Sequence, residues 1–143
     1  MRNHNIIENK TARLAEFLNE LEDVRPKGSF DDYRKNPSIK RSCERLIQLI
    51  VESAADINST FVIGLNEPPP KDYYDTFIKA GETGLIDKSL AEELAPWAGL
   101  RNRLVHEYEA IKDRLVYEKI GPTIARFKEY LKQVERSIRL SKR

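Results

Sequence analysis

Hydrophobic residues recur along the chain with the three- and four-residue spacing of amphipathic helices. The first such stripe, with charged residues between its members, predicts a helix from about Asn5 to Val24. Asn36 and Pro37, a cap residue followed by a first-turn proline, predict the start of a second long helix that continues to about Gly64. Two adjacent apolar stripes run along this second helix, so we expect it to be central in its domain or shared between subunits.

Shorter elements are predicted around the long helices. Ser29 is placed to cap a short turn before the second helix. The three prolines at 68–70 favour an extended loop. A shorter helix is expected over residues 72–82, with Gly81 and Gly84 stopping it.

The last third of the chain predicts two more helices. The segment from Ser89 to Glu92 matches a capping box and predicts the start of a fourth helix, which Pro96 should kink or restart. The last helix is expected to begin near Asp113, because seven apolar residues then follow at helical steps. Gly121-Pro122 lies inside that stripe and predicts a bend.

These elements predict an all-α fold, an up-and-down bundle of four to five helices, since no strand alternation, repeat or linker interrupts the helical pattern. We expect a single domain over residues 1–143, with its core at about 6–131 and a basic C-terminal helix end or tail at 132–143. Residues 126–143 carry seven basic and two acidic side chains. Those charges fit a solvated helix face and frayed tail, an RNA-binding surface or a partner contact.

The composition narrows the class of protein. A net charge of +2 does not by itself imply nucleic-acid binding. A single cysteine, Cys43, excludes an internal disulfide and a cysteine-cluster metal site, and its helical position favours a small buried residue over a nucleophile. The N-terminus is charged and amphipathic, and no run approaches the length of about 18 apolar residues expected of a membrane span. We therefore expect a cytoplasmic protein with no membrane contact.

The stretch 100–108 combines the helical pattern with groups suited to phosphate chemistry. In the helix that would carry this stretch, the face expected to pack in the core comprises Trp97, Leu100, Leu104 and Ile111. His106 falls on the opposite face with Asn102 one turn before it, whereas Arg101 lies about 140° around the helix from His106. One straight helix therefore cannot aim Arg101 and His106 at the same point. Either the helix ends or distorts near His106, or long side chains converge over its edge, or a symmetric partner completes the site.

These residue types fit RNA cleavage without a metal ion. The imidazole of His106 has an unperturbed pKa of about 6.5, which lets it take a proton from a ribose 2′-hydroxyl near neutrality. The guanidinium of Arg101 matches phosphoryl oxygens that gain negative charge. Asn102 would orient the imidazole or donate to phosphate, and Tyr108 would hydrogen-bond phosphate or stack on a base. A purely structural role for the same residues stays open, with Arg101 in an ion pair and Tyr108 in the core.

The spacing of Arg101, His106 and Tyr108 matches the R-x4-6-H-x-Y motif of HEPN-domain ribonucleases. The longer string 99–106, Gly-Leu-Arg-Asn-Arg-Leu-Val-His, resembles the HepT toxins of HEPN/minimal-nucleotidyltransferase (HepT/MNT) toxin–antitoxin systems. The expected order of helices fits as well, over about residues 6–131. The resemblance implies a homodimer in which the two motifs meet in an interface cleft.

The resemblance also implies an activity and a partner. The chain would be the toxin of a type VII-like system, a metal- and cofactor-independent endoribonuclease that cleaves tRNA or mRNA to 2′,3′-cyclic phosphate ends. Arg101 and His106 would be catalytic and Asn102 and Tyr108 supporting. A minimal nucleotidyltransferase antitoxin would neutralise the toxin by transferring AMP to Tyr108, adding charge and bulk where the RNA phosphate binds.

Two other functions remain compatible with the sequence. The bundle would instead be a non-catalytic interaction or nucleotide-binding subunit for a separate nucleotidyltransferase, with the motif as its docking surface. A helical nucleic-acid binder is disfavoured by the low net charge.

Overall fold

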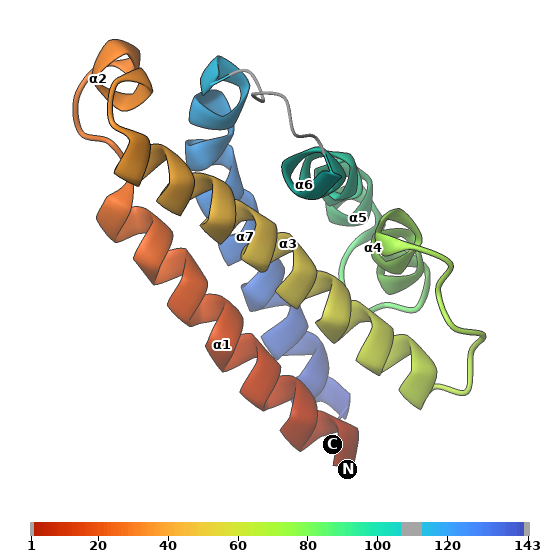
Figure 1. Cartoon of the computed structure of the whole chain (residues 1–143). Coiled ribbons are helices and arrows are strands. Elements are labelled where there is room, and N and C mark those ends of the chain that lie inside the picture. Colours follow the sequence, from red (N-terminus) through yellow and green to blue (C-terminus); the bar gives the residue numbers. More distant parts are fainter. Residues whose placement is uncertain (1, 107–112, 142–143) are drawn as a thin grey trace.

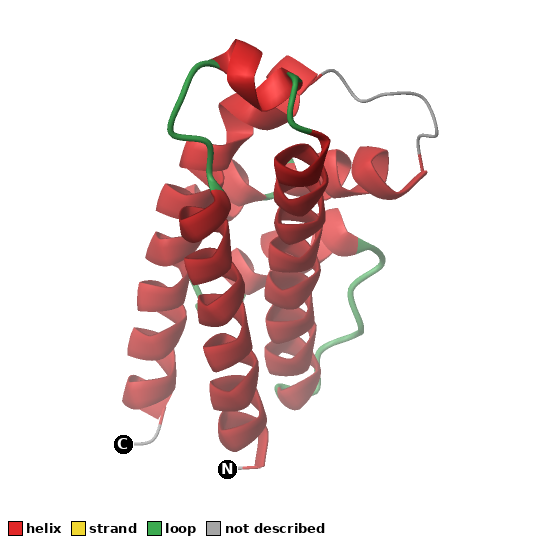
Figure 2. Ribbon diagram, turned by 60° about the vertical axis from the view of Figure 1, so that its left-hand side comes forward, coloured by secondary structure: helices red, strands yellow, loops and turns green. Residues whose placement is uncertain are grey.

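The computed structural model describes residues 2–106 and 113–141, and this part of the chain forms seven helices (Figures 1 and 2). Their bounds are α1 Arg2–Val24, α2 Phe30–Arg34, α3 Pro37–Gly64, α4 Tyr73–Glu82, α5 Lys88–Leu94, α6 Trp97–His106 and α7 Asp113–Ser141. The all-α fold is confirmed. The predicted four to five helices were too few, because the turn after Ser29 forms a helix of its own and Pro96 separates α5 from α6.

The long helices α1, α3 and α7 lie side by side, and α4, α5 and α6 pack on the other side of α3 (Figure 1). α3 is therefore the central helix, as its two apolar stripes predicted. By length and composition alone it would also suffice to cross a membrane, contrary to our expectation that no run approaches this limit. Its place in the fold accounts for this composition, since ten of its side chains are buried in the core.

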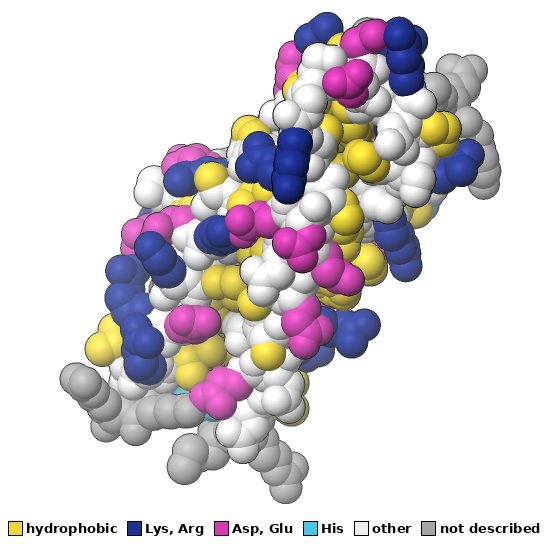
Figure 3. Space-filling view, turned by 90° about the vertical axis from the view of Figure 1, so that its left-hand side faces the viewer, with side chains coloured by type: hydrophobic (Ala, Val, Ile, Leu, Met, Phe, Trp, Pro, Cys, Tyr) yellow, Lys and Arg dark blue, Asp and Glu magenta, His cyan; other side chains and the backbone are white. Residues whose placement is uncertain are grey.

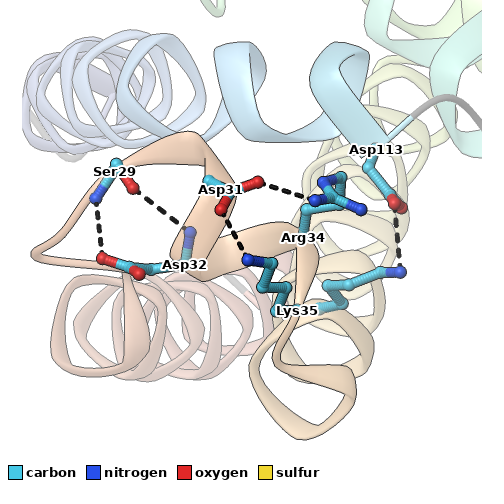
Figure 4. Close-up of polar contacts among 7 residues, drawn as sticks. Ser29, Asp31, Asp32, Arg34, Lys35 and Asp113 are labelled. Carbon is cyan, nitrogen blue, oxygen red and sulfur yellow. Dashed lines mark hydrogen bonds and ion pairs between the residues drawn. The ribbon is translucent and has the colours of Figure 1, made fainter.

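The predicted starts of α2, α3 and α4 are confirmed by their capping contacts. The Ser29 hydroxyl accepts the Asp32 amide N–H at 3.2 Å while the Asp32 carboxylate accepts the Ser29 N–H, which forms a capping box (Figure 4). The Asn36 side chain accepts the Ile39 amide in the same way, and Asp72 caps α4. Local residues thus define where these three helices begin.

Polar contacts around α2 tie the start of α7 to the start of α3 (Figure 4). The Asp31 carboxylate accepts from Lys35 at 2.9 Å and from Arg34 at 2.7 Å, and these hydrogen bonds lower its pKa. The Lys40 ammonium of α3 lies 3.1 Å from the Asp113 carboxylate of α7. One charged pair thus joins α3 to the start of α7, and the pairs of Asp31 lie within α2 and its C-cap.

Two local predictions were wrong. The capping box expected at Ser89 does not form. The N-cap residue of α5 is Asp87, two residues earlier, and its amide donates to the Gln133 side chain of α7 at 2.7 Å. Gly81 does not stop α4 but lies inside it, where a Cβ would come within 2.7 Å of the Ala91 methyl group. Close packing of α4 on α5 explains this glycine.

α7 continues through Pro122 to Ser141, and its buried residues include Val134 and Ile138. The core thus reaches beyond residue 131, where we expected it to end. The face on the α1 side carries interspersed basic and acidic side chains, with no field of a single sign (Figure 3). This surface agrees with the small net charge of the chain.

Candidate active site

The first half of α6 is anchored in the core. The Trp97 indole N–H donates to the Thr123 hydroxyl of α7 at 2.9 Å, and the indole packs edge-on against Phe127 with ring centroids 5.8 Å apart. Leu100 is buried and Leu104 is partly buried against the core. The predicted core face of α6 is confirmed at these residues, and Ile111 lies outside the described residues. Because this face of α6 is packed in the core, Asn102 and His106 on its other side face outward.

Arg101 is held by contacts from three helices. Its Nε and Nη2 atoms each lie 2.9 Å from Oε2 of Glu52 on α3, and its Nη1 donates to Oδ1 of Asn102 at 3.2 Å. The guanidinium carbon lies 4.5 Å from the centroid of the Tyr73 ring at the start of α4, which is a cation–π distance. The side chain of Gln48, one turn before Glu52, donates to the same Glu52 oxygen at 3.0 Å.

The arginine retains hydrogen-bonding capacity. A guanidinium has five N–H groups, and three of those of Arg101 are engaged in the described part of the chain, which leaves two for further acceptors. Its side chain is 17% exposed, so solvent and a ligand can reach it. The structure therefore shows the ion pair that the structural interpretation of Arg101 predicted, and the two remaining N–H groups of this mostly buried cation are suited to a phosphate oxygen.

His106 and Asn102 lie on the outward side of α6, as predicted. Both are exposed, and Asn102 precedes His106 by one helical turn. Because α6 is helical from Trp97 to His106, the angular separation of Arg101 from His106 is retained. The structure thus brings Arg101 and Asn102 into contact, with Asn102 lying between Arg101 and His106 around the helix. Tyr108 lies outside the described residues.

Two residues of this cluster were not predicted from the sequence. Glu52 is the one acidic residue among the apolar positions 46–55 of α3, and that break in the pattern was a usable signal. Tyr73 gave no such signal, because an aromatic residue in the first turn of an amphipathic helix is ordinary core material. Only the fold brings both residues to Arg101.

Cys43 is fully buried, as expected of a structural residue. Burial raises the pKa of its thiol to about 11, which disfavours the nucleophilic thiolate. Within residues 2–106 and 113–141, no three His, Cys, Asp or Glu side chains are grouped so as to hold a metal ion.

The arrangement of helices is that of HEPN proteins. The chain superposes with a TM-score of 0.81 on the tri-AMPylated HEPN toxin of Shewanella oneidensis, solved in complex with an MNT antitoxin. The match covers 91% of this chain and 96% of that chain, at 22% sequence identity. At this level of identity the superposition establishes the fold alone.

The sequence carries the assignment further. The family model "Ribonuclease HepT-like" matches residues 14–134, and the chain belongs to this family. It is 33% identical to the tRNA nuclease HepT of Aphanizomenon flos-aquae, over 90% of this chain and 87% of the relative. It is 24% identical to the mRNA nuclease HepT of Shewanella oneidensis, over 90% of this chain and 95% of the relative.

Proposed function

We propose that this chain is the toxin of a HepT/MNT toxin–antitoxin system and acts as a cytoplasmic, metal-independent endoribonuclease on tRNA or mRNA. The observation that carries the proposal is Arg101, clamped by Glu52, Asn102 and Tyr73 with two N–H groups remaining. A charged group fixed in this way is preorganised for a phosphate, and membership of a ribonuclease family points to RNA.

In the proposed reaction His106 removes the proton from a ribose 2′-hydroxyl. The 2′-oxygen then forms a bond to the adjacent phosphorus, and the bond between phosphorus and the 5′-oxygen breaks. The departing 5′-oxygen takes up a proton, so the products carry a 2′,3′-cyclic phosphate and a 5′-hydroxyl. Arg101 stabilises the charge on the phosphoryl oxygens, and Asn102, whose Oδ1 accepts from Arg101, orients the imidazole or donates to the phosphate.

A homodimer would complete this site. Arg101 and His106 are separated around one helix. A two-fold axis that brought two α6 helices together would place the arginine of one copy near the histidine of the other. The second histidine would then protonate the leaving oxygen. Sedimentation of the purified chain tests whether it forms this homodimer, and a monomer that cleaves RNA would exclude the shared site.

We further propose that a nucleotidyltransferase antitoxin neutralises the toxin at Tyr108. The Tyr108 hydroxyl attacks the α-phosphorus of ATP, pyrophosphate leaves, and the tyrosine becomes an AMP ester. The added phosphodiester repels an RNA phosphate from Arg101. The AMPylated state of the structurally similar HEPN toxin supports this proposal. Intact-mass measurement of the co-expressed chain and its Tyr108→Phe variant should show added AMP only when the tyrosine is present.

The deciding experiment compares three unmodified proteins on total RNA in excess EDTA: wild type, His106→Ala and His4→Ala. His4 provides a matched control, because it is the second histidine of the chain and lies in α1. We expect wild type and His4→Ala to produce cyclic-phosphate ends and His106→Ala to produce none. No difference in cleavage between wild type and His106→Ala, in a chain that still binds the antitoxin when the antitoxin is added, would favour the non-catalytic interaction subunit.

A further inference from the structure

A pocket of about 360 Å³ opens beside Arg101. Its lining comes from three helices and one loop: Ser59 of α3, Pro70 of the loop between α3 and α4, Asp72, Tyr73 and Thr76 at the start of α4, and Asn102 of α6. Tyr73 and Asn102 are also the residues that contact the Arg101 guanidinium. The pocket and the proposed phosphate site therefore share two side chains, and its volume falls in the range of about 300–1,000 Å³ typical of ligand sites.

The polar groups of this pocket divide into engaged and available atoms. The Thr76 hydroxyl is engaged, since it donates to the Tyr73 carbonyl at 2.7 Å and accepts from Asn58 at 3.4 Å. Asp72 uses Oδ1 to cap the Asp75 amide at 2.8 Å. Its Oδ2 atom, the Ser59 hydroxyl and the Asn102 amide nitrogen have no protein partner among the described residues.

The charge of the pocket selects against a phosphate. The Asp72 carboxylate accepts hydrogen bonds and repels anions, whereas Arg101 next to it attracts them. An RNA strand crossing this surface would therefore place its phosphate at Arg101 and its uncharged base in the pocket. Sequence-specific RNA recognition commonly uses such an arrangement, in which an unpaired base lies against an aromatic side chain with its edge hydrogen-bonded.

Resting on the proposed ribonuclease function, we propose that this pocket binds the base next to the cleaved phosphate and prefers bases with an exocyclic amino group. The Asp72 carboxylate accepts the amino N–H of cytosine, adenine or guanine, and the Asn102 amide donates to the neighbouring ring or carbonyl acceptor. In the orientation that cytosine takes, uracil places its O4 oxygen against the Asp72 carboxylate and its N3–H against the Asn102 NH₂ group, so both contacts are lost. Asp72 is then the residue that sets the base preference.

The test exchanges the carboxylate without removing the helix cap. In Asp72→Asn the amide oxygen still caps the Asp75 amide, while the new NH₂ group can donate to a uracil oxygen. Asp75→Asn is the matched control, because Asp75 lies on the same turn and accepts the Lys71 amide N–H but does not line the pocket. The two variants remove the same charge at neighbouring positions.

Both changes are made in the His106→Ala background, and the affinities of oligo(A), oligo(C) and oligo(U) are measured by fluorescence anisotropy. We expect the parent to bind oligo(U) about tenfold more weakly than oligo(C), a typical discrimination for one well-placed polar contact. Asp72→Asn should remove this difference, and Asp75→Asn should keep it. Equal affinities in the parent, or equal shifts in both variants, would overturn the pocket as a base site.

Cleavage by wild type separates this inference from the function on which it rests. If wild type cleaves RNA in EDTA but the His106→Ala parent binds the three oligonucleotides equally, the ribonuclease stands and the base pocket fails. If the Asp72-dependent preference is present but wild type leaves total RNA uncut in EDTA, the base pocket stands and the ribonuclease fails. Cleavage with fewer cuts beside uracil, relieved by Asp72→Asn, would support both.

Discussion

Two polar clusters lie next to α3, and they differ in how completely their hydrogen bonds are satisfied. In the buried cluster the Tyr130 hydroxyl lies 2.6 Å from Asn58 Oδ1 and 3.0 Å from the Ala54 carbonyl, and Asn58 donates to Thr76. Tyr130 and Asn58 are fully buried. In the Arg101–Glu52 cluster the arginine side chain is partly exposed and keeps two N–H groups for another molecule.

The comparison separates structural polarity from functional polarity. A buried polar group that is fully paired holds helices in register, and one that keeps capacity toward solvent is equipped to bind a ligand. The clusters are also connected, because the Thr76 hydroxyl donates to the Tyr73 carbonyl while the Tyr73 ring contacts Arg101. Because the two clusters nevertheless differ in burial, we expect mutations in the buried cluster to lower stability and mutations in the Arg101–Glu52 cluster to lower activity.

The largest effect should follow from removing the catalytic groups. His106→Ala is expected to lower the cleavage rate by about 10²–10⁴-fold, the usual contribution of a positioned acid or base. Arg101→Ala is expected to lower it by about 10²–10³-fold, the usual cost of removing one group that stabilises transition-state charge. The exposed His106 should change the free energy of unfolding by no more than about 0.5 kcal/mol. Cleavage assays paired with urea denaturation test this, and unfolding of both variants would return these residues to a structural role.

The buried cluster should show the opposite behaviour. Tyr130→Phe removes a hydroxyl paired with Asn58 and should destabilise the fold by about 1–3 kcal/mol while cleavage is retained. Tyr33→Phe is the matched control, because its hydroxyl is buried with no hydrogen-bond partner in the described residues, so its removal should cost little or stabilise. Equal urea midpoints for the two variants would contradict the assigned role of the Tyr130 hydroxyl.

How much of this could be predicted from the sequence depends on the range of the interactions. The beginnings of α2 and α3 were predicted because Ser29 and Asn36 cap through residues three positions away. The start of α4 was predicted from its apolar pattern, and the structure adds a cap of the same local kind at Asp72. The box at Ser89 failed because Gln133, more than forty residues further on, supplies the hydrogen bond that fixes the residue before α5. Local signals thus held where the contacts were local.

The site divides in the same way. The outward positions of Asn102 and His106 follow from helical periodicity, and the structure agrees. The contact of Arg101 with Glu52 joins residues 49 positions apart, and the Tyr73 contact depends on the path of the loop before α4. No periodicity within one helix encodes such pairings. The sequence therefore predicted the candidate catalytic groups but not the residues that hold them.

A change at Glu52 would sharpen the comparison, because this residue supports the site without touching the reacting atoms. Glu52→Gln keeps the shape and an acceptor oxygen for Arg101 but removes the charge. We expect kcat to fall about tenfold, since a loosened guanidinium is less well aligned, while KM is unchanged or lower. Asp56→Asn, one turn further along α3 at an exposed position, should change neither. A fall of the same size in both variants would assign the effect to general surface charge.

The smallest expected effect concerns pH and the buried thiol of Cys43. Burial, followed by the nearby charge of Glu44, raises the pKa of this thiol from 9.0 to about 11. Between these two values the unfolded chain loses the proton that the folded chain retains, so the free energy of unfolding should fall as pH rises from about 9 and be unaffected below it. Burial also raises the pKa values of Tyr33 and Tyr130, so only a change in stability below pH 10 can be assigned to the Cys43 thiol.

Urea denaturation of wild type and Cys43→Ala between pH 8 and pH 10 tests this expectation. The variant should start from a lower stability, because a buried side chain has been shortened, but its stability should change less over this range. Parallel pH profiles would show that the thiol titrates alike in the folded and unfolded chains. A steeper fall in wild type would show that the buried Cys43 thiol stabilises the fold only while it remains uncharged, as expected also of the buried Tyr130 hydroxyl.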